Sequence, residues 1–315
     1  SQTWNVCLCK KINIMNATIK AEGICKSYKK VTALKDISLT IDNGEIFGLI
    51  GPDGAGKTTL FRILTTLSLA DSGTAEVCGL DVVKDYVKIR SEIGYMPGHF
   101  ALYQDLSVEE NLQFYASIFG TDVKSNYGNI KEIYRQLEPF KTRRAGALSG
   151  GMKQKLALCC ALVHRPKVLF LDEPTTGVDA VSRKEFWAML RRIRESGVSI
   201  LVSTPYMDEA ALCDRIAMIS EGHIIGGGTP EQIRESYPDK LYAAKGSDIF
   251  GMLRVLRATE GVIECNSFGS LCHVSVGETG PDASALESVL KQAGFADARV
   301  ESIEPGIEDC FMRLS

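Results

Sequence analysis

The chain has 315 residues, of which 45% are hydrophobic and 24% charged, and its formal net charge is −3. These proportions are near those of globular proteins and exclude a disordered chain, a collagen or a small disulfide scaffold. Residues 240–315 hold 7 basic and 11 acidic side chains, which leaves 29 and 28 for residues 1–239. Neither part has the basic excess that is typical of a nucleic-acid-binding protein.

Two further classes of protein are disfavoured by simple patterns. The longest apolar run, Leu156–Val163, has eight residues, whereas a membrane span needs about 18–20. We therefore do not expect the chain to cross a membrane by itself. The ten cysteines form no C-x-x-C pair and do not group with histidines, so we expect free, mostly buried thiols.

Residues 1–14 lack the apolar core and the preceding basic residues of a signal peptide. We interpret them as a leader, an added segment or an early strand, and Met15 as a plausible natural start. From about residue 17, short apolar runs alternate with helical patterns, which predicts an α/β fold with a parallel sheet covered on both faces. The expected strands are Ile46–Ile50, Val168–Leu171, Ser199–Ser203 and Ile216–Ile219, and Leu60, Ile63, Leu64 and Leu67 mark one helix.

The pattern changes in two further places along the chain. Residues of about 100–165 favour an inserted helical subdomain. Breaks at Gly226–Pro230 and Ser236–Pro238 then precede a smaller unit, whose β-α-β-β-α-β order predicts a ferredoxin-like α+β domain. We therefore expect an α/β domain over residues 15–235 and an accessory domain over residues 236–315.

A glycine-rich loop between an apolar strand and a helix gives the strongest signal, G-x-x-x-x-G-K-T. Glycines allow backbone N–H groups to converge on phosphate oxygens, and a helix N-terminus adds its own donors. Lys57 is expected to reach the β- and γ-phosphates, and Thr58 to bind Mg²⁺. The candidate phosphate-binding residues are Gly51, Pro52, Asp53, Gly54, Ala55, Gly56, Lys57, Thr58 and Thr59.

The second motif is an apolar strand, Val168–Leu171, followed by Asp172 and Glu173. Ligands of open α/β sheets bind at this end of the strands. Asp172 is expected to complete the Mg²⁺ site, and Glu173 to act as a general base or to orient the attacking water.

The third motif, LSGGMKQK, starts at Leu148. It predicts a helix capped by Ser149, with Gly150 and Gly151 forming another anion-binding helix start.

Together, the three motifs over about residues 18–235 resemble the ATP-binding subunits of ABC transporters. The segments GPDGAGKTTL and PGIEDCFMRL are similar to those of the daunorubicin-resistance type of bacterial drug exporters. The resemblance implies an ATPase of the P-loop fold that uses ATP and Mg²⁺ at the inner face of the membrane. It implies a membrane permease and a second ATP-binding subunit, identical or different, as partners. It also implies that Tyr28 stacks on adenine, although a plain strand tyrosine is an alternative. Ser149, Gly150 and Gly151 would complete the partner's ATP site.

Two positions depart from that family pattern. Gly98 stands where the family has a glutamine that contacts Mg²⁺ and water, and Pro205 stands where it has a γ-phosphate-sensing histidine. ATP binding should survive these changes, whereas turnover is expected to be slow unless His99, Gln104 or Tyr206 substitutes. A nucleotide-binding regulatory subunit with little turnover is therefore an alternative function. An ABC ATPase that acts on nucleic acid or ribosomes is disfavoured by the near-neutral charge and the single P-loop.

Two parts of the chain can each be interpreted in two ways. The segment Gly98–Leu106 receives a helix of the membrane subunit in the family, but its Phe100, Leu102 and Tyr103 could equally pack internally. The C-terminal domain could sense a ligand or stabilise a dimer.

Overall fold

The computed structural model describes residues 17–98 and 102–315. Our interpretation of residues 1–14 and Met15, and the roles considered for His99 and Phe100, therefore lie outside the described residues. The chain divides into two compact units, one extending to Pro230 and including residues 314–315, the other covering Glu231–Arg313.

An antiparallel sheet that the sequence did not predict begins the first unit. Strands β1 (Ala17–Tyr28) and β2 (Val31–Asp42) form a long hairpin, and the strand order is β2-β1-β4-β5. Shifts of register, for example between Ala21 and Ile24, interrupt the alternation of buried and exposed residues. This interruption explains why the expected pattern of strands and helices is wrong here. The remaining strands are β4 (Ser72–Val77) and β5 (Leu80–Asp81).

The second sheet of this unit has the predicted parallel strands, in the order β10-β9-β3-β8-β7-β6. Only its edge pair, β10 with β9, is antiparallel. The predicted break at Gly226–Pro230 is wrong in part, because residues 226–228 belong to β10. A side chain on Gly226 would lie 2.9 Å from Met218 Cε, so these glycines allow close strand packing. The strands are β3 (Ile46–Ile50), β6 (Ile93–Met96), β7 (Val168–Asp172), β8 (Ser199–Thr204), β9 (Arg215–Ser220) and β10 (His223–Gly228).

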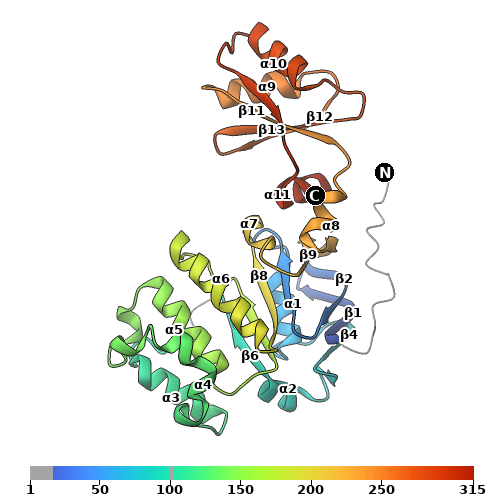
Figure 1. Ribbon diagram of the computed structural model, residues 1–315. Coiled ribbons are helices and arrows are strands. Elements are labelled where there is room, and N and C mark those ends of the chain that lie inside the picture. Colours follow the sequence, from blue (N-terminus) through green and yellow to red (C-terminus); the bar gives the residue numbers. More distant parts are fainter. Residues whose placement is uncertain (1–16, 99–101) are drawn as a thin grey trace. The chain divides into compact units, whose positions relative to one another are not determined.

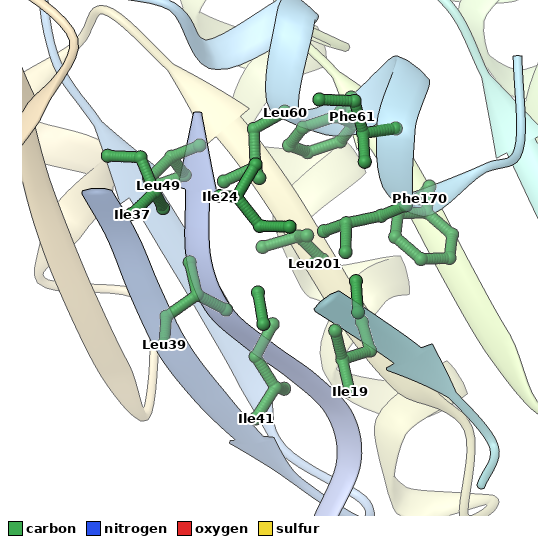
Figure 2. Close-up of a cluster of buried hydrophobic side chains, with 14 of the residues drawn as sticks. Ile19, Ile24, Ile37, Leu39, Ile41, Leu49, Leu60, Phe61, Phe170 and Leu201 are labelled. Atoms are coloured by element: carbon green, nitrogen blue, oxygen red, sulfur yellow. The ribbon is translucent and has the colours of Figure 1, made fainter. Parts of the chain in front are cut away.

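The core of the first unit lies between the two sheets and helix α1 (Lys57–Leu64), as Figure 2 shows. Leu60 and Phe61 of α1 pack there with Phe170 of β7, whose ring meets that of Phe61 edge to face at 6.0 Å. The expectation that Leu67 lies on the same helix face is wrong. The helix ends at Leu64, Thr66 adopts a positive φ of 64°, and Leu67 is 56% exposed.

The predicted helical stretch contains three α-helices, shown in green in Figure 1. Ser107 caps the first of them in a capping box with Glu110, which accounts for its start. In the sequence, helix α2 directly precedes β6, and α6 lies between β7 and β8. These helices are α2 (Tyr86–Glu92), α3 (Val108–Ile118), α4 (Val123–Tyr134), α5 (Gly150–Leu162), α6 (Ala180–Glu195) and α7 (Met207–Ala210), with 3₁₀ turns at Glu138–Phe140 and Ala145–Ala147.

The second unit confirms the predicted β-α-β-β-α-β order. Its antiparallel sheet has the order β12-β13-β11-β14, and two helices pack on one face around Met252, Leu256 and Leu290. This is the ferredoxin-like arrangement. The elements are α8 (Pro230–Glu235), β11 (Lys240–Lys245), α9 (Ile249–Arg257), β12 (Val262–Phe268), β13 (Leu271–Val276), α10 (Ala283–Gln292), β14 (Arg299–Ser302) and α11 (Ile307–Leu314).

The eight cysteines among the described residues are all free thiols, and six of them are buried, as the sequence predicted. Burial raises the pKa of the Cys159 and Cys160 thiols, which favours the uncharged form. No helix in the described parts of the chain is long and apolar enough to span a bilayer.

Candidate functional site

The glycine-rich loop joins the end of β3 to the first turn of α1. Gly56 precedes the helix with a φ of 109°, and a Cβ there would lie 2.5 Å from the carbonyl oxygen of Ala33 on β2. Only glycine fits both conditions. No side chain caps the helix, so its N-terminal N–H groups face the loop. Gly51, Pro52, Asp53, Gly54 and Ala55 form the rest of the loop, and Thr58 and Thr59 lie in the first turn of α1.

Lys57 lies at the centre of this loop and is only 3% exposed. Its Nζ donates hydrogen bonds to the carbonyl oxygens of Gly51 at 2.8 Å and Pro52 at 2.9 Å. The same ammonium pairs with Glu173 Oε1 at 3.1 Å, whereas the exposed carboxylate of Asp53 is 4.0 Å away. The loop thus fixes a positive charge beside the N-terminus of α1, an arrangement that favours an anion.

The acidic pair lies at the carboxyl end of β7. Asp172 is 2% exposed and accepts a hydrogen bond from Ser203 Oγ on the neighbouring strand β8, at 2.6 Å. Glu173 has a positive φ of 51° and donates its N–H to the oxygens of Ser203. A non-glycine residue in this conformation is strained, and the flanking bonds hold it there. Lys57, Asp172 and Glu173 therefore meet at one edge of the sheet.

The residues at this edge suit a magnesium ion. Thr58 offers a hydroxyl in the first turn of α1, and Asp172 offers a carboxylate that Ser203 orients. Mg²⁺ prefers a few such oxygen ligands together with phosphate and water oxygens. The buried carboxylate of Asp172, held beside the phosphate-binding loop, is an oxygen ligand of this kind.

The neighbouring strand β6 contributes neutral groups to this edge. Burial raises the pKa of Tyr95 to about 12, and the negative charge of Asp172 acts in the same direction. Gly98 follows this strand, and a Cβ on it would lie 3.2 Å from the carbonyl oxygen of Asp172. The position that departs from the family pattern is therefore directly beside the acidic pair.

Pro205 follows Thr204 at the end of β8, where proline supplies no backbone N–H. The next N–H, of Tyr206, is bonded to Thr204 Oγ1 at 3.0 Å. Of the possible substitutes, Tyr206 has its ring under the Arg183 guanidinium at 4.4 Å, and the carbonyl of Gln104 accepts from Gly146. Neither residue has a recorded contact with Asp172 or Glu173 among the described residues.

The LSGG segment begins α5, and Ser149 accepts a hydrogen bond from the N–H of Met152 at 3.4 Å, as predicted for its cap. A Cβ on Gly151 would lie 2.6 Å from Ser182 Oγ of α6, and one on Gly150 would lie 3.6 Å from the Gly177 carbonyl. Ser149 and Gly150 are exposed. Within the chain, this loop therefore packs on the start of α6 and leaves its capped end accessible.

Tyr28 ends β1 and is paired with Val31 across the hairpin. Its ring is 42% exposed, and Lys26 Nζ lies 5.5 Å from the ring centre. The close approach of Gly56 to Ala33 places this end of the hairpin near the phosphate-binding loop. Tyr28 is thus accessible at the end of the hairpin that approaches the loop.

A mostly apolar cavity of about 340 Å³ lies beside the Gly98 segment. Leu102 lines it and is buried, whereas Tyr103 is half exposed and packs edge to face with Phe114 at 4.6 Å. Burial lowers the pKa of His164, which also lines the cavity, so its ring stays neutral near pH 7. Apolar lining residues include Ile93, Met96, Pro97, Ile118, Phe119, Ala157 and Ala161, and the polar ones include Thr65, Arg90, Tyr95 and Gln154.

Sequence reasoning missed two polar residues that hold this edge together. Ser203 bonds Asp172 and Glu173 from β8, and the buried Glu209 bonds Thr175 and Thr204. The only available signal was that polar residues end an apolar strand, SILVST, and this pattern does not specify their partners.

A phosphate-binding loop and an acidic strand end at one edge of a mostly parallel sheet define a P-loop nucleotide-binding protein. The family model described as ABC transporter matches residues 34–176. The daunorubicin resistance ATP-binding protein DrrA2 of Streptomyces coeruleorubidus is 33% identical over 307 residues, 94% of each chain. The chain therefore belongs to the ABC transporter family.

Further similarities agree with this assignment. The probable multidrug ABC transporter ATP-binding protein YbhF of Escherichia coli is 36% identical over 310 residues, 95% of this chain. The match spans only 52% of YbhF, so the chain covers about half the length of that relative. A solved ATP-binding subunit of an ABC transporter has a TM-score of 0.64 and 26% identity, over 70% of this chain and 93% of the other.

Proposed function

We propose that the chain is the ATP-binding and ATP-hydrolysing subunit that energises an ABC exporter through a membrane partner. The observation that carries the proposal is the meeting of Lys57, Asp172 and Glu173, with Lys57 Nζ 3.1 Å from Glu173 Oε1. The named functions of DrrA2 and YbhF support the exporter role. The chain covers only about half of YbhF, so the transport activity of a complete protein is also part of this proposal.

The geometry suggests how the chain's residues divide the work. The loop N–H groups and Lys57 hold the β- and γ-phosphates, and Tyr28 stacks on adenine. Thr58 and Asp172 would hold Mg²⁺, which neutralises phosphate charge when it is bound. When Lys57 turns to the γ-phosphate, its pair with Glu173 opens. Glu173 then accepts or orients the proton of the attacking water, and in-line attack yields ADP and phosphate.

The exposed end of α5 fits a two-subunit arrangement. Ser149, Gly150 and Gly151 pack on their own α6 but present a capped helix start to the outside, where a second ATP-binding subunit could place its nucleotide. A solved bacterial cassette with 25% identity and a TM-score of 0.61 is described as dimeric, which supports this proposal. The partner subunit is an identical or a different chain.

We assign residues 15–235 to the ATP-binding domain and residues 236–315 to an accessory domain. The compact second unit, with its own core around Met252 and Leu256, supports the assignment. Its role is to stabilise the dimer or to sense a ligand.

The function is tested by steady-state phosphate release from ATP by the full chain together with the membrane protein that co-purifies with it. Release of phosphate that depends on ATP and Mg²⁺ is the expected result. A chain that binds no ATP would overturn the proposal.

A permease is proposed to dock in the cavity lined by Leu102, Ala157 and His164, because an apolar hollow beside Gly98 suits a short apolar helix. Replacing the half-buried Ala157 by arginine should fill the hollow and place a charge in it. We expect Ala157→Arg to reduce co-purification of the membrane protein by about tenfold, since one unpaired charge at an apolar contact costs more than about 1.4 kcal/mol. The control Gln113→Arg lies on the exposed face of α3 and should leave co-purification unchanged. Equal capture by both variants would place the docking site elsewhere.

A weakly active, regulatory subunit is the second candidate function, and Gly98 and Pro205 favour it. If the missing donor at Pro205 limits turnover, Pro205→His should raise the maximal rate of phosphate release by roughly tenfold, part of the roughly 10²–10³ that one prepositioned contact contributes. Pro205→Ala, which restores the N–H without an imidazole, is the matched control. A rate that is the same in both variants and in the unmodified chain would show that Pro205 does not limit turnover.

A further inference from the structure

The carboxylate of Glu209, on the short helix α7, lies where three segments of the site meet. The residue is 1% exposed. Its Oε2 accepts a hydrogen bond from Thr204 Oγ1 at 2.6 Å, and its Oε1 accepts from Thr175 Oγ1 at 2.7 Å. Arg183 Nε donates to the same Oε1 at 3.1 Å. One buried acidic group thus joins the end of β8, the loop after β7 and a helix.

Each of these partners adjoins a residue of the proposed ATP site. Thr204 immediately precedes Pro205 at the end of β8, and Thr175 follows Glu173 by two positions. The Thr176 N–H donates to the Glu173 carbonyl at 3.3 Å, which ties the same loop to the acidic residue. Through two hydroxyl groups, Glu209 is therefore tied to the end of β8 and to the loop that follows Glu173.

The third partner, Arg183, connects Glu209 to the helix against which the LSGG loop packs. Arg183 lies on α6 next to Ser182, whose Oγ would be 2.6 Å from a Cβ on Gly151. The same helix starts at Asp179, which caps it by accepting from the N–H groups of Val181 and Ser182. A shift of Arg183 along the axis of α6 would therefore move Ser182, against which the LSGG loop packs.

The network contains a buried carboxylate paired with Arg183, which argues against a purely stabilising role. Arg183 also pairs with Asp208 at 3.0 Å and covers the ring of Tyr206. A buried ion pair is weak evidence for stability, because an apolar group of similar volume often serves as well. The Glu209 carboxylate does fix the relative positions of the residues bonded to it, because breaking any one of these bonds leaves a buried charge poorly paired.

We propose that Glu209 is a positioning residue that couples the hydrolytic end of one ATP site to the LSGG loop of the same subunit. Because that loop serves the partner's nucleotide, the two ATP sites of a dimer would then respond together. The inference rests on the proposed function and deepens it by naming the residue through which the sites are coupled.

The test compares Glu209→Gln with the control Glu185→Gln in the full chain. Glu185 lies on α6, like Arg183, and pairs with Lys155 of α5 at 2.7 Å instead of with Glu209 or its hydrogen-bond partners. In a Glu173→Gln background, which retains bound ATP, sedimentation measures ATP-driven dimerisation. We expect Glu209→Gln to raise the ATP concentration for half-maximal dimerisation about tenfold, within the usual range of coupling between sites. ATP binding to the monomer, measured by fluorescence, should stay within about threefold.

A second readout is the Hill coefficient of phosphate release in the chain with intact Glu173. It should exceed about 1 in the unmodified chain and in Glu185→Gln, and fall to about 1 in Glu209→Gln. If Glu209→Gln folds poorly, Thr175→Val removes one hydrogen bond without removing a charge, and it should show the same loss in part.

The outcomes separate this inference from the function on which it rests. Dimerisation and Hill coefficients in Glu209→Gln and Thr175→Val that equal those of Glu185→Gln would overturn the coupling role. A loss of monomer ATP binding in step with the other readouts would show a structural role only, and would also overturn it. If the unmodified chain neither binds ATP nor dimerises with it, the proposed function itself fails.

Discussion

Replacing Lys57 by alanine should lower the affinity for ATP by about 10²–10³-fold. The side chain is buried, lies between the loop carbonyls and Glu173, and has no other cation in its recorded contacts to replace it. Two charge-assisted hydrogen bonds to phosphate oxygens, at about 1.5–2 kcal/mol each, in the lower part of the usual range, account for a change of that size. Equilibrium binding of a fluorescent ATP analogue by the full chain measures it.

Lys88→Ala is the matched control, because it removes an exposed lysine of α2 that pairs only with Asp85 in the recorded ion pairs. It should bind ATP as the unmodified chain does. Melting curves of both variants without nucleotide show whether the loop still folds, since Lys57→Ala also frees two carbonyl groups. Unchanged affinity in a folded Lys57→Ala variant would contradict the assignment of the phosphate-binding loop.

Replacing Glu173 by glutamine should reduce the maximal rate of phosphate release by about 10²–10³-fold while ATP still binds. Glutamine has the same shape and can still accept a bond from Lys57, but it is a far weaker proton acceptor. Glu173 has a strained backbone, and its N–H donates to two oxygens of Ser203. These bonds hold the backbone at the strand end, so the substitution should not move it. Single-turnover phosphate release and ATP binding are measured on the same sample.

Glu185→Gln is the control for a lost carboxylate elsewhere in the same unit. A Glu173→Gln variant with an unchanged rate would remove Glu173 from the chemistry. A variant that loses ATP binding together with the rate would assign Glu173 to holding Lys57 rather than to activating water.

The motifs of the site could be predicted because each one is local. The P-loop needs a strand, a glycine turn and a helix in succession, and Lys57 and Thr58 follow from that order. Asp172 and Glu173 end an apolar strand, and parallel strands bring their carboxyl ends to one edge. The sequence therefore predicted which residues lie at this edge, and in the parallel sheet β3 and β7 are separated only by β8.

The antiparallel sheet could not be predicted in the same way. In β1 and β2, bulges between residues such as Ala21 and Ile24 shift which side chains face the core, so the period of two is lost. The glycines of β10 have the composition of a turn, yet they form a strand because β9 approaches closely. Both errors come from tertiary packing that overrides a local pattern.

The contacts of Ser203 and Glu209 were equally inaccessible to sequence reasoning. Ser203 is 31 positions from Asp172, and Glu209 is 34 positions from Thr175. No spacing rule connects residues at such separations on different elements. Only the three-dimensional order of β7 and β8 shows that a serine hydroxyl contacts the acidic pair and that a buried carboxylate joins the end of β8 to the loop after β7.

The central claim is that ATP hydrolysis at Lys57, Asp172 and Glu173 drives a membrane partner. Its most direct test is phosphate release in lipid vesicles that contain the chain with its co-purified membrane protein, compared with the chain alone. The account predicts that the partner raises the rate and that Glu173→Gln removes the stimulated part. A rate that is the same with and without the partner, and unchanged by Glu173→Gln, would contradict it.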